Sequence, residues 1–573
     1  MVKPRPPFAL GENSMKPFQT LRYFAKFVSG GKDMNVRLAI WFLVWLSLLS
    51  ATLQLALPRA IAADTDGDGL LDLIDVPGFD PNAADKLYFD DRGIQDLDGA
   101  SLLTNATELH LPVNQITSIE SGDFAGLDNL ELLWLADNQI TSIEHGDFAG
   151  LDNLQGLVLA RNRITSIGSG NFTGLDNLQV LNLGANQLTS IESGDFRGLG
   201  NLQELYLWEN RITSIESGDF QELRNLQFLD LYANQITSIE RGDFAGLDNL
   251  QRLHLIDNQL ASIESGAFAG LHHLQELSLY GNRITSIESG AFAGLDNLQT
   301  LSLENNHITR LERGDFTGLE NLQSLWLAFN QITSIESEDF QGLENLRRLY
   351  LWGSQLTSIE RGDFAELHNL QTLELTDNQI TSIERGDFAG LDHLTELVLL
   401  RNQITSIERG TFAGLDSLRT LDLRGNGITQ LNLSNASLHS LQACHREDQE
   451  PYFSQGFCID SSKITNVVLD SAVLSLGSFE AIIGETEFIT SASLVGLTFS
   501  DTNPVDMRRL LDISTLDNVT VDKALFERYA AEFNAFAALP GNTVTVVPEP
   551  SAIGLLAMGL LALVNAKRDR RAP

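Results

Sequence analysis

The sequence is poor in cysteine, in basic residues and in the short motifs on which catalysis depends. Two cysteines, Cys444 and Cys458, occur among 573 residues, which excludes a disulfide-dense scaffold, and no C-x-x-C spacing supports a zinc site. Lysine and arginine number 38 against 76 acidic residues, giving a net charge of −38. This excess argues against a nucleic-acid partner, whose phosphates attract basic surfaces. The chain has no G-x-S-x-G, H-E-x-x-H or G-x-x-x-x-G-K motif, so we expect no enzymatic activity.

What the sequence has in abundance is repetition. An Asn returns at every twenty-fourth position from Asn114 to Asn426, and Ser354 is the one substitution in this series. A fixed period of this length indicates a stack of supersecondary units, each of which buries its apolar face against its neighbours. The pattern therefore favours recognition by an extended surface over chemistry in a pocket.

One unit of the repeat predicts a short strand and an irregular return. Leu133 and Leu135 alternate with other residues, as in a strand with one buried face. The apolar residues that follow are spaced too irregularly for a helix, and the return contains glycines. Each unit is therefore predicted to be a strand, a turn and an irregular or 3-10 return arm. A second register, Phe124–Phe412, is predicted to stack in the core opposite the strands.

The recurring Asn has a predicted structural role. It lies where the chain leaves the strand, so the backbone groups there are buried and cannot pair within a sheet. An amide side chain can donate and accept, so we expect it to bond those groups and its neighbours above and below. Ser354 offers only a hydroxyl, which predicts a locally weaker stack.

The frame L-x-x-L-x-L-x-x-N-x-I-x-x-I-x-x-x-x-F-x-x-L resembles the leucine-rich repeat in its 24-residue variety, over roughly residues 105–440. The resemblance implies an α/β repeat solenoid, a horseshoe with a concave parallel β-sheet. Residues 87–112 are predicted to form an entry repeat and residues 113–433 the regular array. Residues 466–546 read as strand–helix repeats that continue the solenoid, with a small separate α/β cap as the alternative.

The strand positions beside the buried leucines are predicted to face the concave side, and there the repeats differ from one another. Aromatic and Arg side chains, the usual anchors of protein interfaces, gather near residues 204–232 and 326–352. We predict a site for a protein partner or a surface polysaccharide. Drift in a duplicated array is the alternative, although it does not explain the aromatic enrichment. The candidate residues are Trp134, Tyr206, Trp208, Phe228, Tyr232, His254, Tyr280, Trp326, Arg348, Tyr350 and Trp352, and Phe329 also lies at such a position.

Acidic residues form a column of their own. A Glu recurs from Glu120 to Glu408 with one gap at Gly168, and an Asp often precedes the Phe of the repeat. We interpret this column as a solvated edge, with a weak divalent-cation strip as the alternative. The corresponding functional alternative is a structural component of extracellular matrix or biofilm whose acidic array gathers cations.

Residues 63–86 contain an acidic loop that suits calcium. Carboxylates fall at loop positions 1, 3, 5, 9 and 12 around a glycine, as hard-oxygen coordination requires. The segment resembles thrombospondin type 3 and dockerin-like calcium loops, and the resemblance implies structural calcium. The alternative is an acidic spacer. The candidate ligands are Asp64, Asp66, Asp68, Leu70, Asp72 and Asp75.

The amino-terminal segment, residues 1–62, reads as export material. Arg37 precedes an apolar run over residues 38–57, and an A-x-A site predicts cleavage after Ala62. An uncleaved anchor is the alternative, and Met34 is an alternative start.

The other end, residues 547–573, resembles the PEP-CTERM sorting signal of Gram-negative bacteria. Pro548, Glu549 and Pro550 precede an apolar stretch over residues 551–564 and a basic tail. The resemblance implies an exosortase-like sorting enzyme, transient inner-membrane anchoring through a C-terminal helix, and a cell-surface, outer-envelope or extracellular destination. A simple membrane anchor is the alternative. In such an oxidising compartment, Cys444 and Cys458 are predicted to close a disulfide within a cap over residues 434–465.

Overall fold

The computed structural model describes the repeat array continuously and the carboxyl-terminal part in segments. The described residues are 70–77, 79–81, 85–434, 437–438, 445–446, 454–455, 457–459, 466–469, 473–474, 491–494, 497–499, 507–511, 516 and 518–547. Several predictions therefore concern residues outside these ranges, namely the export segment 1–62, Asp64, Asp66, Asp68, Cys444 and the motif Pro548-Glu549-Pro550.

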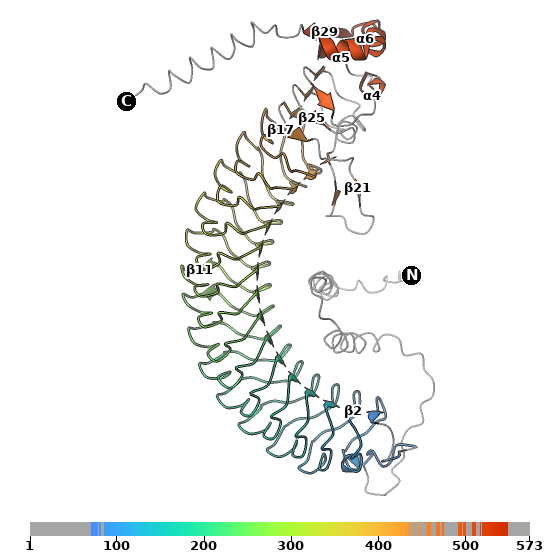
Figure 1. The fold of residues 1–573 in the computed structure, drawn as a ribbon, viewed down its shortest axis with the longest axis vertical. Coiled ribbons are helices and arrows are strands. Elements are labelled where there is room, and N and C mark those ends of the chain that lie inside the picture. The colour runs from blue at the N-terminus through green and yellow to red at the C-terminus, as the bar shows by residue number, and fades with distance from the viewer. Residues whose placement is uncertain are drawn as a thin grey trace, which may run out of the picture. The chain divides into compact units, whose positions relative to one another are not determined.

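One parallel sheet of 16 strands lines the inner side of the curved repeat array (Figure 1). Equivalent residues of successive repeats are register partners, as Leu301 and Leu325 show. Columns of side chains therefore run across the sheet. In order, its strands are β1 (Lys86–Tyr88), β2 (Glu108–His110), β3 (Leu132–Trp134), β4 (Gly156–Val158), β5 (Val180–Asn182), β6 (Glu204–Tyr206), β7 (Phe228–Asp230), β8 (Arg252–His254), β10 (Glu276–Ser278), β12 (Thr300–Ser302), β13 (Ser324–Trp326), β14 (Arg348–Tyr350), β15 (Thr372–Glu374), β16 (Glu396–Val398), β18 (Thr420–Asp422) and β23 (Phe457–Cys458).

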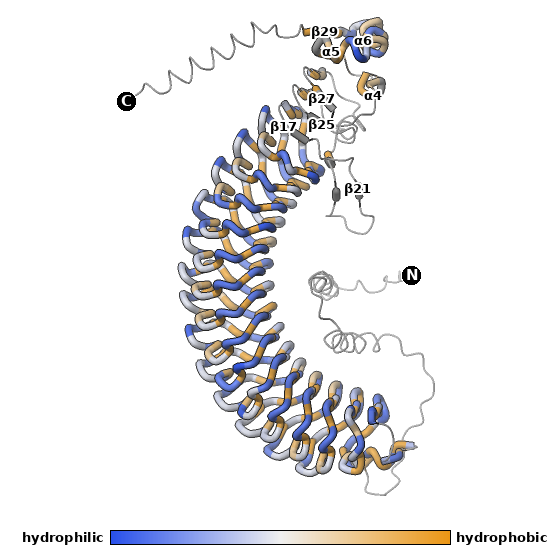
Figure 2. The backbone as a smooth tube through the Cα atoms, in the orientation of Figure 1, coloured by the Kyte–Doolittle hydropathy of each residue, from blue (hydrophilic) through white to orange (hydrophobic). Residues whose placement is uncertain are grey.

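The core of the array lies between this sheet and the return arms. The central Leu of each regular strand, such as Leu133, is fully buried. On the return arm, neighbouring Phe rings stack with centroids 6.4 Å apart for Phe124 and Phe148 and 6.1 Å apart for Phe268 and Phe292. Figure 2 shows apolar and polar segments alternating at the same places in successive coils. The predicted strand, the irregular return arm and the Phe stack are confirmed.

The recurring Asn bonds the repeats together, although in one direction only. The amide nitrogen of Asn138 donates to the carbonyl oxygens of Leu111 at 2.9 Å and Leu135 at 3.1 Å, and its Oδ1 accepts the N–H of Ile116 at 3.1 Å. These bonds reach the preceding repeat and the residue's own strand, rather than both neighbours as we predicted. Ser354 makes none of them, because its Oγ is buried without a hydrogen-bond partner in the described part of the chain.

The Asp that precedes the Phe closes a turn of the return arm. In a typical repeat, Asp219 accepts the backbone N–H of Glu216 at 2.8 Å, and burial raises the pKa of its carboxyl to about 6. The same bond recurs at Asp195 and Asp363. These Asp residues therefore hold the return arm together instead of lining a solvated edge. The residue pattern alone did not reveal this role.

The carboxyl-terminal strands extend a second parallel sheet that begins on the return arms. Its strands, in order, are β17 (Ser406–Ile407), β19 (Gln430–Asn432), β24 (Asn466–Val468), β26 (Ser491–Ser493), β28 (Asn518–Asp522) and β29 (Thr543–Val547). Helix α4 (Arg508–Leu511) precedes β28, and α5 (Lys523–Arg528) and α6 (Ala530–Ala537) lie between β28 and β29. The predicted strand–helix order is therefore present near this end.

The remaining elements are short. They are η3 (Ala100–Leu102), the return-arm pair β9 (Ser262–Ile263) and β11 (Ser286–Ile287), the three strands β20 (Ser437–Leu438), β25 (Val473–Leu474) and β27 (Thr498–Phe499), and the antiparallel pair β21 (His445–Arg446) and β22 (Ser454–Gln455). Among the residues that the structure describes, no helix has both the length and the apolar character to cross a bilayer.

Candidate functional site

The predicted partner-binding residues lie on the inner face of the 16-stranded sheet, at the two outer positions of each strand and just after it. Their exposure divides them into two groups. Arg348 is exposed, and the half-exposed ones are Trp208, Tyr232, Tyr280, Trp326, Tyr350 and Trp352. Trp134, Tyr206, Phe228 and His254 are buried. The first group can contact a partner directly, whereas the second builds the floor beneath it.

The floor around β6–β8 is an aromatic packing unit. Phe228, only 2% exposed, packs edge-on against Tyr206 at 5.3 Å and His254 at 4.9 Å between ring centroids. The Arg252 guanidinium lies 4.6 Å from the centre of the Phe228 ring. The Tyr206 hydroxyl donates to Glu204 at 2.7 Å, and burial together with this carboxylate raises the Tyr206 pKa well above its usual value. Phe228 thus fixes its neighbours rather than meeting solvent.

Trp208 lies on the same face. Its indole occupies the space above Gly184, where any Cβ would collide with the ring. The Arg161 guanidinium lies 5.9 Å from the ring centre, within the range of a cation–π contact. Because Gly184 has no side chain, the Trp208 indole can pack directly against its backbone.

A second cluster lies over β13 and β14. The rings of Trp326 and Tyr350 stack with centroids 3.7 Å apart, and those of Phe329 and Trp352 meet edge-on at 4.2 Å. Phe329 is 48% exposed and has a left-handed backbone, with φ of 52°. The two aromatic zones suggested by the sequence are therefore compact clusters of side chains.

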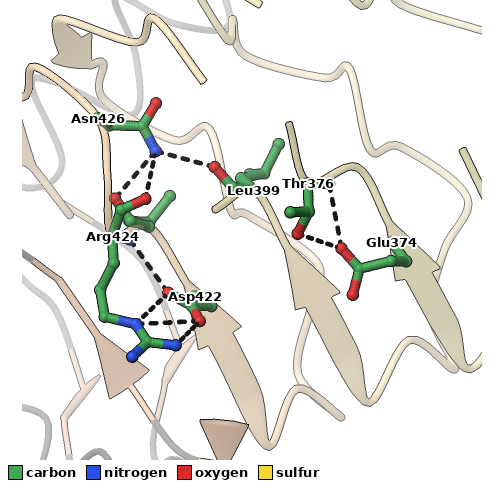
Figure 3. Close-up of polar contacts among 7 residues, drawn as sticks. Glu374, Thr376, Leu399, Asp422, Arg424 and Asn426 are labelled. Carbon is green, nitrogen blue, oxygen red and sulfur yellow. Dashed lines mark hydrogen bonds and ion pairs between the residues drawn. The ribbon is translucent and has the colours of Figure 1, made fainter. Parts of the chain in front are cut away.

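Two carboxyls beside this cluster were not predicted. Glu304 is buried on the inner face, and burial raises its pKa to about 8. Glu374, half-buried, accepts the Thr376 backbone N–H at 3.0 Å and also bonds the Thr376 hydroxyl (Figure 3), while burial raises its pKa. The available signal was an acidic residue at an outward position of the repeat next to aromatic ones, at the end of the strand for Glu374 and two residues after the strand for Glu304.

Asp422 shows how a third acid on this face is compensated. Its fully buried carboxylate pairs with the Arg424 guanidinium at 2.5 Å (Figure 3). Beside it, the Asn426 amide donates to the Leu399 carbonyl at 2.8 Å, which continues the asparagine ladder. The hydrogen bonds described for Glu374 come from Thr376, which is uncharged, whereas Asp422 pairs with the charged Arg424.

The amino-terminal end of the sheet carries a ladder of stacked rings. Tyr88 and His110 lie 4.4 Å apart between centroids, and His110 and Trp134 lie 5.7 Å apart. The Trp134 indole N–H is buried and has no hydrogen-bond partner among the described residues. Lys86 pairs with Glu108 at 2.6 Å beside this ladder.

In the described half of the acidic loop, Asp72 accepts hydrogen bonds from backbone groups of the same segment. Asp72 and Asp75 are buried, whereas Leu70 is exposed. One Asp72 oxygen accepts the N–H groups of Ile74 at 2.7 Å and Asp75 at 3.2 Å. No group of three or more His, Cys, Asp or Glu side chains within the described ranges could hold a metal. Because the other three ligands lie outside those ranges, the calcium loop remains a prediction.

The cysteine pair is described at one end only. Cys458 is buried in β23 and is disulfide-bonded. The other cysteine of the chain, Cys444, lies outside the described residues. The backbone of Cys458 accepts the Leu423 N–H at 2.7 Å, so this strand is joined directly to the end of the regular array.

These features define a solenoid of repeats. Side chains at equivalent strand positions line up in columns across its inner face. The leucine rich repeat model matches residues 104–164, 152–207, 200–260, 248–308, 296–356, 344–404, 368–428 and 392–443, which together cover more than half of the chain. The chain belongs to the leucine-rich repeat family. Its end, residues 546–571, matches the PEP-CTERM protein-sorting motif, which indicates an exported protein sorted to the cell envelope or extracellular space.

Solved structures share this fold. A leucine-rich-repeat protein of Leptospira interrogans is 23% identical, with 81% of this chain and 96% of that one covered and a TM-score of 0.50. A chain of the Drosophila Toll–Spatzle complex is 22% identical, with 74% of this chain and 54% of that one covered and a TM-score of 0.54. A search of the curated proteins finds no match. These likenesses concern the fold alone.

Proposed function

We propose that this protein acts outside the cytoplasm, at the cell surface or beyond it, by binding a protein partner through the inner face of its sheet. The observation that carries the proposal is the gathering of exposed and half-exposed aromatic and Arg side chains in two clusters on that face. The same positions in other repeats hold small residues, such as Ser302 in the column of Trp326 and Tyr350, and Ala160 and Gly184 in that of Trp208. Folding of the repeat therefore does not require the large ones.

The rigidity of this face supports the proposal. The aromatic side chains rest on short strands whose central leucines are fully buried and whose turns are held by the Asn bonds. Side chains fixed before binding lose little conformational freedom on association, so their contact area contributes to affinity. Aromatic and Arg anchors in such surroundings are typical interface hot spots.

The proposal extends to processing at the carboxyl terminus. The sorting motif over residues 546–571 favours recognition by an exosortase-like enzyme, with transient membrane anchoring before release or attachment. A surface polysaccharide is the other ligand class that stacked aromatic rings suit. A structural matrix role is the second candidate function, and the recurrent acidic column of the return arms favours it.

The test compares two versions of the full chain produced in its native cells. One replaces Trp208, Tyr232, Tyr350 and Trp352 with Ala, and the control replaces four exposed return-arm residues, Glu222, Arg224, Glu320 and Glu344, with Ala. After surface cross-linking and capture, we expect a protein that is recovered with the wild type and the control but lost with the inner-face variant. Recovery of identical proteins with all three chains, together with intact matrix assembly, would contradict binding through this face.

A further inference from the structure

The inner face between β12 and β15 combines exposed aromatic rings with acidic groups. Ser302, Trp326, Tyr350 and Glu374 are register partners on these four neighbouring strands. Adjacent strands lie about 4.8 Å apart, so the four side chains form one short row. Glu374 is the last member of this row, and Glu304, which follows β12, lies near the first member, Ser302.

Phe329 places an exposed aromatic ring at a turn that every regular repeat makes. The left-handed turn at this position belongs to the repeat, since Asp257, Asn305 and Arg401 have the same positive φ. The adjacent repeats hold Asn305 and Gly353 at the equivalent position, so the turn itself does not call for a large ring. The Phe329 ring lies over Gly353, where an added Cβ would come within 2.6 Å of it. The chain thus accommodates an exposed ring beside Trp352 that the core does not need.

Glu304 is buried on this face with little to compensate it. Among the described residues, its carboxylate receives one side-chain hydrogen bond, from the Ser302 hydroxyl at a long 3.5 Å. No ion pair joins it within the same described residues, in contrast to Asp422 and Arg424. A buried acid in this state gains strongly from a cation that shares its surroundings.

The zone holds more acidic groups than basic ones. Arg348 is exposed and donates to the Ser324 hydroxyl at 3.3 Å, and Glu396 accepts from the Thr372 hydroxyl at 3.3 Å. With Glu304 and Glu374, three carboxyls therefore face one guanidinium. Tyr280 and Tyr350 also lie within electrostatic range of Glu304, and both hydroxyls remain neutral because burial raises their pKa values.

We propose that the aromatic cluster of Trp326, Phe329, Tyr350 and Trp352, between Glu304 and Glu374, binds a basic side chain, lysine or arginine, of a protein partner. The proposal rests on the proposed function and names the chemistry that the inner face recognises. The rings offer negative faces to the cation, and the buried carboxyl supplies its counter-charge. A neutral sugar would fit the rings but would bring no charge to pair with the Glu304 carboxylate. The chain's net charge of −38 would also draw a basic partner from a distance.

Octalysine is the probe, and octalysine with acetylated side chains is its uncharged match. Each is titrated into the full chain by calorimetry in about 0.15 M salt, which suppresses unspecific attraction. Because Glu304 titrates near pH 8, we expect octalysine to bind about tenfold more tightly at about pH 9 than at about pH 6.5. Near neutral pH the reaction should release protons, seen as heats that vary with the ionisation enthalpy of the buffer. Glu374 titrates in the same direction, so a single variant must separate the two.

Glu304→Gln is that variant, since the amide resembles the protonated acid in shape and preserves the fold. It should remove most of the pH dependence, and both Glu304→Gln and Phe329→Ala should weaken octalysine binding about tenfold. The matched control Glu108→Gln, at the other end of the sheet, should bind as the wild type does. Equal affinity for both variants and the wild type, or equal binding of acetylated octalysine, would overturn the cationic site. Such a result leaves the capture experiment above unaffected, so failure of the site and failure of the proposed function are distinguishable.

Discussion

Replacing Ser354 with Asn should strengthen the one interruption in the asparagine ladder. In every other repeat of the series, the Asn amide accepts an N–H group of the preceding repeat, as Asn330 accepts that of Ile308 at 3.0 Å. The equivalent N–H of Ile332 has no partner within the described residues, and Ser354 Oγ is also unpaired there. The repeats on both sides have the regular geometry, so we expect an Asn side chain at position 354 to fit as it does in those repeats.

The expected gain follows from the groups that Ser354→Asn would satisfy. A buried unpaired N–H costs about 1–3 kcal/mol, and each additional hydrogen bond contributes about 1 kcal/mol net. The amide would satisfy the Ile332 N–H and donate to the Leu327 carbonyl, while losing some side-chain freedom. We therefore expect a local stabilisation of about 2 kcal/mol, which corresponds to an about 30-fold smaller population of the locally opened state.

Hydrogen exchange suits this prediction because long repeat arrays do not unfold as one unit. Amide protection over residues 327–357 should rise in the Ser354→Asn chain, most clearly at Ile332. The reverse change one repeat earlier, Asn330→Ser, should lower protection by a similar factor at Ile308. If Ser354→Asn leaves exchange at Ile332 unchanged while Asn330→Ser has its expected effect, the assignment of a weak point to Ser354 is wrong.

Four further predictions concern other parts of the chain. Gly184→Ala should displace the Trp208 indole, visible as a shift in tryptophan emission, whereas Gly200→Ala, where the added Cβ meets nothing within 4 Å, should leave the spectrum unchanged. The Asp carboxyls of the return arms, represented by Asp219 with a pKa of about 6 against 3.8 unfolded, bind protons more tightly when folded. Their contribution to stability is therefore complete below about pH 4 and lost as pH rises through about 6, so urea midpoints should be higher at about pH 5 than at about pH 7.5. Phe268→Ala should destabilise its repeat by about 3–5 kcal/mol, measured by hydrogen exchange at the amides of that repeat, because the ring is fully buried in the Phe stack. Calcium titrated into the chelator-treated full chain should give a saturable heat that Asp66→Asn reduces, and the absence of heat at millimolar ion would remove calcium from the acidic loop.

The period of the sequence predicted the fold well because every repeat carries the same instructions. Leu133 and its equivalents alternate as strands do, and the Phe register fills the opposite side of the core at the same interval. What differed was the direction of the Asn bonds, since spacing alone cannot tell which neighbour an amide reaches. The Asp turn closure was also missed, because an acid in a surface pattern looks solvated until its backbone partner is known.

The candidate surface was predicted at the level of position rather than exposure. The outward strand positions were correctly located, yet Phe228 proved buried because Tyr206 and His254 arrive from strands 24 or so residues away on either side. Glu304 was overlooked for the same reason. The sequence marks its outward position, but its burial depends on side chains from neighbouring repeats, which the residues around 304 do not show.

The asparagine bonds give the array a polarity along the chain. Each amide completes the hydrogen bonding of the coil that precedes it, so a coil remains open until its successor has been added. A polypeptide that crosses a membrane amino end first would close its coils one at a time, in the order of their arrival. Only the most recent coil would then be exposed at any moment, which limits contact between unfinished chains during export.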